Sequence, residues 1–126
     1  MNADFVIMFG PFVAVKSVNS FVMVIDLSAD SDLVVGIELI SFMFKLRETV
    51  VSPRLPERLP VGVEYHIRED ILYISLNRNS ARRPFRCIHP PIVDCCVMLT
   101  ESDEVAGIRV RCPSTFMMGQ LSSRST

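Results

Sequence analysis

The sequence lacks any long uninterrupted apolar run. A membrane-spanning helix needs about 18 or more consecutive apolar residues, and Lys16 and Asp26 interrupt the most apolar stretch. Residues 1–15 are largely apolar, but Asp4 comes early, and neither a basic leader nor a small-residue cleavage site accompanies them. We therefore expect a cytoplasmic protein without membrane contact.

A strong charge of either sign is also missing. The chain has 13 Lys and Arg residues, 14 Asp and Glu residues and a formal net charge of −1, so it exerts no long-range attraction on nucleic acid or on an acidic membrane surface. The arginines are nonetheless clustered, and Arg suits forked contacts with phosphate or carboxylate groups. The candidate contacts for an anion or a partner are Arg78, Arg82, Arg83, Arg86, Arg109 and Arg111.

Signatures of catalysis and of metal binding are absent as well. The four cysteines have no paired CxxC spacing, which indicates reduced thiols. Cys87 and His89 share one face of a strand, but their spacing is not one that structural zinc sites favour. No local feature activates a cysteine nucleophile with His66 or His89 as its base. We therefore expect no catalytic residue, no metal and no cofactor, and a protein that is not an enzyme.

Three acidic residues in the first half resemble a cation site only superficially. Asp26, Asp30 and Asp32 carry oxygen ligands, but a calcium loop also needs a turn glycine and a distal bidentate carboxylate. Asp and Ser are common in turns because they bond to their own backbone. We interpret these residues as part of a solvated hairpin turn.

Apolar residues are abundant instead. They make up 49% of a chain of 126 residues, and the mean hydropathy is +0.35. This length suits one ordinary domain with its own core. The apolar content is high for a small soluble protein, so we expect part of it to meet a partner.

An internal repeat is the most informative feature. Residues 22–39 and 93–110 both read as an apolar strand, an acidic turn and a return strand through Val-x-Gly-Ile, and they align without a gap. Residues 3–9 likewise resemble residues 69–75. The runs are short and rich in β-branched residues. They predict a mainly β protein with one or two short helices and a two-fold internal repeat of a small antiparallel sheet.

The repeat divides the chain into segments. The first β-meander unit covers residues 1–50, where Ile40, Phe44 and Val50 approach helical spacing and predict a short terminal helix. Residues 51–62 contain three prolines and form a linker, because proline interrupts helices and central strands. Residues 63–118 form the second unit, and residues 119–126 form a polar, flexible tail.

The second unit resembles a known family. Asp70-Ile-Leu-Tyr-Ile-Ser-Leu76 and Val105-Ala-Gly-Ile-Arg-Val110 are similar to the pattern of the small bacterial domain-of-unknown-function family 2283. In the first unit, Leu33-Val-Val-Gly-Ile-Glu-Leu39 is similar to the end of that pattern. The resemblance implies tandem compact β-meanders of uncharacterised activity, and it brings no catalytic residues.

Compared with that family, the first unit lacks an opening strand. An uncovered sheet edge presents unpaired amides and carbonyls to another strand. Either the region after Val61 supplies this strand, or a second chain does. Some strands are also apolar on both faces, which calls for cover on both sides. The predicted interface residues are Phe5, Ile7, Phe9, Phe12, Phe21, Met23, Val24 and Ile25.

These features favour a non-catalytic protein–protein interaction or assembly module that acts as a homo-oligomer or as a subunit of a larger complex. A nucleic-acid-associated protein is the alternative, with the arginine-rich loop contacting phosphates and with Tyr73 and Phe85 stacking on bases. A cysteine-dependent small hydrolase is the third possibility.

Overall fold

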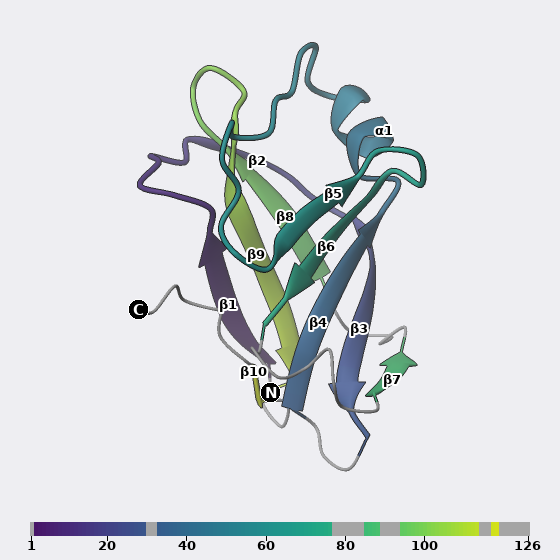
Figure 1. Ribbon diagram of the computed structural model, residues 1–126. Helices are drawn as coiled ribbons and strands as arrows, with labels where there is room; N and C mark the ends of the chain where they lie inside the picture. The colour runs from purple at the N-terminus through teal and green to yellow at the C-terminus, as the bar shows by residue number, and fades with distance from the viewer. Residues whose placement is uncertain (1, 30–32, 77–84, 89–93, 114–116, 119–126) are drawn as a thin grey trace.

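Two antiparallel sheets form the framework of the protein (Figure 1). The computed structural model describes residues 2–29, 33–76, 85–88, 94–113 and 117–118. Sheet A has the order β1-β9-β8-β2, and its strands are β1 (Asn2–Met8), β9 (Val105–Pro113), β8 (Asp94–Leu99) and β2 (Lys16–Val18). The predicted mainly β class is confirmed.

Sheet B is larger, with the order β5-β6-β4-β3-β7. Its strands are β5 (Val63–His66), β6 (Ile71–Ser75), β4 (Leu33–Ile40), β3 (Val22–Ser28) and β7 (Phe85–Ile88). The short strand β10 (Met117–Met118) pairs in parallel with the start of β4. The helix α1 (Phe42–Arg47) follows β4 directly.

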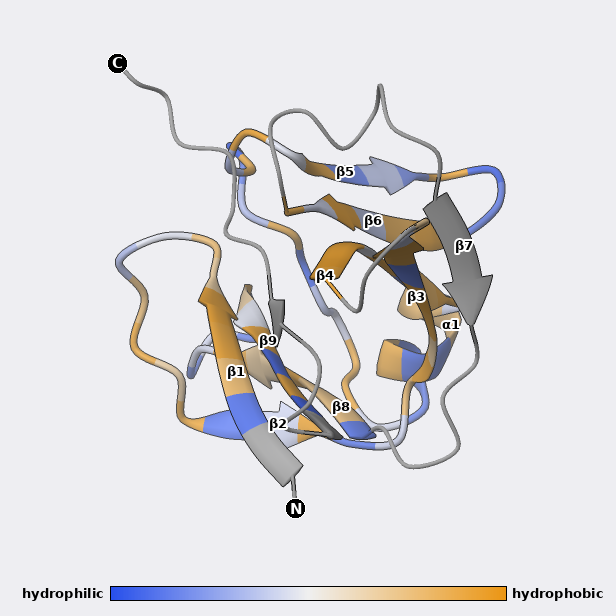
Figure 2. Ribbon diagram, turned by 90° about the horizontal axis from the view of Figure 1, so that it is seen from below, coloured by the Kyte–Doolittle hydropathy of each residue, from blue (hydrophilic) through white to orange (hydrophobic). Residues whose placement is uncertain are grey.

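The two sheets form separate layers with the apolar core between them (Figure 2). Side chains alternate between the two faces of a strand, so every second residue faces the core. One buried cluster contains side chains from both sheets. Sheet A contributes Ile7, Val97 and Ile108 to it, and sheet B contributes Ile37 and Ile74. The core therefore joins the two halves of the chain.

The two halves exchange strands. The hairpin β3–β4 lies at the centre of sheet B, and the hairpin β8–β9 lies at the centre of sheet A. The strand beside β4 is β6, from the second predicted unit, and the strand beside β9 is β1, from the first. On the other side, β7 pairs with β3 and β2 pairs with β8. Each sheet therefore contains strands from both predicted units.

The equivalence of the two sheets extends to single hydrogen bonds. Ile37 pairs with Ile74 in sheet B just as Ile108 pairs with Ile7 in sheet A. Beyond these pairs, the Leu76 N–H in sheet B donates a hydrogen bond to the Val35 carbonyl (3.0 Å). In sheet A, the Phe9 N–H donates the equivalent hydrogen bond to the Ala106 carbonyl (2.8 Å). The internal two-fold repeat is thus present in the backbone pairing.

The structure corrects the ungapped sequence alignment by one residue. Asp26 pairs with Gly36 and Met98 pairs with Gly107, so Met98 is the counterpart of Asp26, whereas the ungapped alignment assigns Val97. A shift by one residue moves a side chain to the other face of a sheet. The difference in length lies in the hairpin turn, where chains tolerate insertions. The sequence alignment of residues 3–9 with residues 69–75 is also wrong by one residue. It matches Ile7 with Tyr73, whereas the strand pairing makes Ile74 the counterpart of Ile7.

The predicted short helix is present, although one of its predicted core residues is exposed. Phe42 and Leu46 are buried in α1, while Phe44 is 67% exposed. The proline-rich connection that follows is anchored to the second hairpin. The Arg54 N–H donates to the Asp103 carbonyl (3.0 Å), and the Val105 N–H donates to the Arg54 carbonyl (2.8 Å). No helix among the described residues is long and apolar enough to cross a membrane. The predicted tail, residues 119–126, lies outside the described residues.

Candidate functional site

Seven of the eight predicted interface residues belong to the core cluster or pack against it, and the eighth, Val24, is buried outside that cluster. Six of the eight are buried, namely Ile7, Phe9, Phe21, Met23, Val24 and Ile25. The other two, Phe5 and Phe12, are partly buried and pack against the core cluster. The strand β3 is buried on both faces, as its apolar sequence predicts. The correction is that these side chains are wholly or partly covered within the chain, and those that face the core are covered because the exchanged strands bring two apolar sheet faces together.

The arginines divide into two groups. Arg78, Arg82 and Arg83 lie outside the described residues, and Arg86 belongs to β7, where only the backbone is described. Arg109 and Arg111 are exposed on one face of β9. These two arginines therefore share one outer surface of sheet A, while the loop that would complete an arginine cluster lies outside the described residues.

Arg111 is engaged by an acidic neighbour on the adjacent strand. Its Nε donates a hydrogen bond to Asp4 Oδ1 (2.9 Å), and this bond lowers the pKa of Asp4 and raises the pKa of Arg111. A polar hollow of about 360 Å³ surrounds this ion pair, and Asp94, Cys96 and Arg109 also line it. The outer face of sheet A therefore carries charges of both signs.

The Cys95 thiol is unsuited to nucleophilic chemistry. Cys95 and Cys96 are free and buried, and burial raises the pKa of the Cys95 thiol, with a further contribution from Cys96. A nucleophilic thiol needs the opposite shift. His89 and the side chains of Cys87 and Cys112 lie outside the described part of the chain. Within the described part, no group of three or more His, Cys, Asp and Glu side chains is placed to hold a metal ion.

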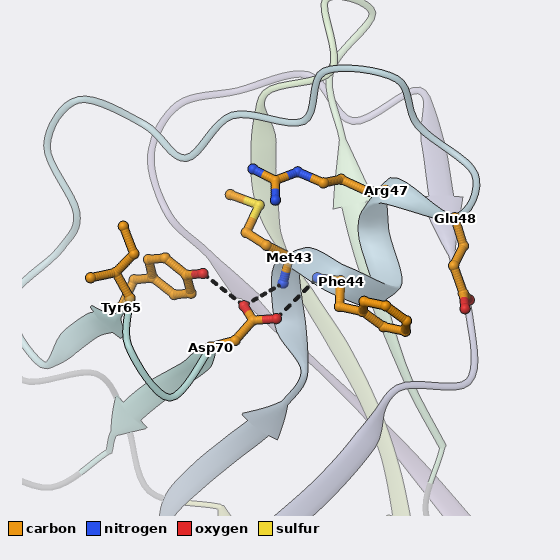
Figure 3. Close-up of a pocket in the computed structure, with 7 residues that line it drawn as sticks. Met43, Phe44, Arg47, Glu48, Tyr65 and Asp70 are labelled. Carbon is orange, nitrogen blue, oxygen red and sulfur yellow. Dashed lines mark hydrogen bonds between the residues drawn. The ribbon is translucent and has the colours of Figure 1, made fainter.

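An open groove lies between α1 and the turn that joins β5 to β6 (Figure 3). Its volume is about 640 Å³, and its lining residues are Met43, Phe44, Arg47, Glu48, Tyr65, Ile67 and Asp70. Phe44 and Ile67 are 67% and 78% exposed. Ligand sites usually combine apolar walls with a few convergent polar groups, and here the most central polar group, Asp70, is already engaged.

Asp70 fixes the start of α1 from the neighbouring hairpin. Its carboxylate accepts hydrogen bonds from the Met43 N–H (2.8 Å), the Phe44 N–H (3.0 Å) and the Tyr65 hydroxyl (2.7 Å). Burial opposes ionisation of Asp70, but these three bonds outweigh it and lower the pKa of the carboxyl. Burial and the bond to Asp70 raise the pKa of Tyr65 to about 12. Figure 3 shows Tyr65 and the helix N-terminus converging on the carboxylate. We assign Asp70 a structural role.

A pair of carboxyl groups on sheet B escaped the sequence analysis. Asp26, which we expected in a solvated turn, lies in β3 and is only 1% exposed. Burial raises the pKa of Glu38 to about 7, together with the hydrogen bond that its protonated carboxyl donates to Asp26 and the repulsion by the Asp26 charge. A Cβ at Gly36 would lie 2.8 Å from Asp26 Oδ2 and 3.1 Å from the Tyr73 hydroxyl. Gly36 thus leaves room for this polar cluster, and the sequence signal for it was an acidic residue inside an apolar strand.

The outer side of β1 is the remaining candidate surface. In sheet B, β6 is covered by β5, with Glu64 opposite Tyr73 and His66 opposite Ile71. In sheet A, the counterpart of β6 is β1, and among the described residues no strand lies on its outer side. The Met8 and Val6 side chains next to this edge are 36% and 55% exposed. Among the described residues, this edge is therefore covered in its sheet B copy, on β6, and open in its sheet A copy, on β1.

Comparisons with known proteins give no relative. No family model matches the chain, and neither a curated protein nor a solved structure is significantly similar to it. The resemblance to family 2283 therefore remains a prediction.

Proposed function

We propose that the protein is a non-catalytic interaction module that binds a polypeptide by adding a strand to the open edge of β1. The open edge of sheet A, whose counterpart in sheet B is covered, carries this proposal. Strand addition is a common mode of peptide recognition, in which backbone hydrogen bonds supply affinity and alternate side chains supply specificity. Two free thiols in the described residues suit the cytoplasm, where we place the protein.

Alternate residues of β1 direct their backbone groups toward the edge. The Phe9 N–H donates a hydrogen bond to the Ala106 carbonyl. The backbone N–H and C=O groups of Phe9, and of every second residue before it, therefore point toward β9. Val6 and Met8 consequently point their N–H and C=O groups to the open side. The counterpart of Met8 supports this assignment, because the Ser75 N–H donates to the Gly62 carbonyl (2.7 Å) on the β5 side of β6.

The covered edge also indicates the side chains that a bound strand needs. In β5, Val63 is buried and Tyr65 is partly buried, while Glu64 and His66 face outward and are exposed. A strand on β1 would likewise place apolar side chains toward the core and polar ones toward solvent. Its outward residues would lie near Asp4, Arg109 and Arg111.

A peptide titration tests the proposal. The probe is a synthetic peptide with the sequence of residues 61–67, and amide chemical shifts of the isotope-labelled protein report its binding. We expect concentration-dependent shifts at Val6, Met8 and their neighbours, and none at Ser17 on the edge strand β2. A control peptide with prolines at the residues corresponding to Glu64 and His66 lacks the required donors and should not bind. Shifts of equal size for both peptides, or none at β1, would contradict the proposal.

A further inference from the structure

The open edge is the longest and least protected of the sheet edges that the structure describes. Proteins protect exposed edge strands by keeping them short or by placing charges and prolines on them. The strand β2 has three residues and includes Lys16, and β5 has four residues and includes Glu64 and His66. The strand β1 has seven residues, and Asp4 is its single charged residue. The bond from Arg111 neutralises that charge.

We propose that the polypeptide at this edge is a second copy of the same chain, whose β1 pairs antiparallel with β1 of the first. This inference rests on the proposed function and names its partner. Two antiparallel copies of one strand are related by a two-fold axis, so the contact is isologous and closed. The four strands of sheet A would then continue into the four strands of the second copy.

The covered edge of sheet B gives the register. There, pairing on the outer side of β6 runs from Ser75, which bonds to Gly62, to Ile71, which pairs with His66. The equivalent span of β1 is residues 4–8, and its middle residue is Val6. A two-fold axis at Val6 uses this whole span.

Near the two-fold axis, this register places apolar side chains opposite one another on both faces. On the outer face, Val6 of one copy lies opposite Val6 of the other, and the 55% exposed side chain gains an apolar neighbour. On the inner face, Phe5 lies opposite Ile7 of the other copy, which extends the row of core side chains. Aromatic and β-branched residues that lie directly opposite one another stabilise a sheet.

Charge exchange at Val6 provides the test. The variants Val6→Lys and Val6→Glu each place like charges opposite one another in the dimer, which weakens pairing, whereas in a mixture opposite charges meet. The side chain of Val6 is exposed, so the fold of each copy tolerates either charge. Val22→Lys and Val22→Glu are matched controls, because Val22 is also a strand valine and is 59% exposed.

Sedimentation equilibrium over a range of concentrations measures the outcome. We expect the unmodified chain and both Val22 variants to form dimers. Each Val6 variant alone should dimerise at least about tenfold more weakly, and an equimolar mixture of the two should recover the dimer. A monomeric unmodified chain, or a dimer that both Val6 variants retain, would overturn the inference.

The proposed function is tested separately. If the unmodified chain is a monomer but the peptide of residues 61–67 binds at β1, strand addition stands and self-pairing fails. If the chain lacking residues 119–126 dimerises and the full chain does not, the chain's own C-terminal residues occupy the edge, and that result also overturns self-pairing.

Discussion

The variant Asp70→Ala, which lacks the Asp70 carboxylate, should have a free energy of unfolding about 3 kcal/mol lower than that of the unmodified chain. Losing the side-chain cap of a helix costs about 1 kcal/mol, and α1 would lose acceptors for the Met43 and Phe44 N–H groups. The partly buried Tyr65 hydroxyl would lose its acceptor, at about 1 kcal/mol. Residue 70 is also left-handed, with φ 56°, a conformation that costs alanine about 1 kcal/mol or more.

Urea unfolding of a small variant set separates these contributions. Asp70→Asn keeps a residue that tolerates the left-handed conformation and one acceptor oxygen, so it should lose only about 1 kcal/mol. Tyr65→Phe should lose about 1 kcal/mol, and the double variant Asp70→Ala/Tyr65→Phe should be more stable than the two separate losses predict, because both remove the same bond. Additive losses, or an Asp70→Ala variant as stable as the unmodified chain, would refute the assignment.

The ionised form of Asp70 also predicts a dependence on acid. Because the pKa of Asp70 is lower in the folded chain than its ordinary value of 3.8, its stabilisation is present above pH 3.8 and is lost as the pH falls through the folded pKa. The stability difference between the unmodified chain and Asp70→Asn should therefore narrow in acid. A difference that stays constant down to pH 2 would contradict this reasoning.

Three further predictions follow from the outer faces and the core. The pKa of Glu38 is raised from 4.5 to about 7, so the folded chain binds the proton more tightly than the unfolded chain and stability should fall as the pH rises from 4.5 to 7. Urea unfolding at these two pH values measures this fall. The variant Glu38→Gln should reduce the fall by on the order of 1–2 kcal/mol, after allowance for solvent screening. Gly107→Ala should cost about 2–3 kcal/mol by thermal unfolding, because its Cβ would lie 2.3 Å from the Ile7 carbonyl oxygen, whereas Gly36→Ala meets movable side-chain atoms and should cost less. Val24→Glu should unfold the chain, as circular dichroism would show, because Val24 is 9% exposed, whereas Val22→Glu should leave the spectrum unchanged.

The local elements could be predicted from the sequence, but their partners could not. The alternation of apolar residues and the Val-x-Gly-Ile repeat indicate the two hairpins that the structure contains. They do not indicate that β1 joins β9 and that β6 joins β4, because β1 and β6 have similar patterns and either would suit either hairpin. An apolar strand such as β3 shows that both faces need cover, but not whether the cover comes from the same chain. For that reason the predicted interface residues are buried or partly buried within the chain.

The polar sites depend on contacts between distant segments. Asp70 caps a helix that begins at Phe42, and Asp4 bonds to Arg111 across the exchanged strands. Neither pair has a local signature, since each arises only after the sheets have formed. By contrast, the position of Arg109 and Arg111 on one face of β9 follows from the side-chain period of two once the strand is known.

Amide hydrogen exchange along β1 tests the central claim most directly. In dilute protein, the N–H groups of Val6 and Met8 should exchange much faster than those of Phe9 and Ser75, whose hydrogen bonds lie within the sheets. As the protein concentration rises, Val6 and Met8 should become protected. Protection of Val6 and Met8 that is already complete in dilute protein would show that the edge is closed within the chain, and rapid exchange at every concentration would show that no second copy pairs with it. Either result would contradict the account.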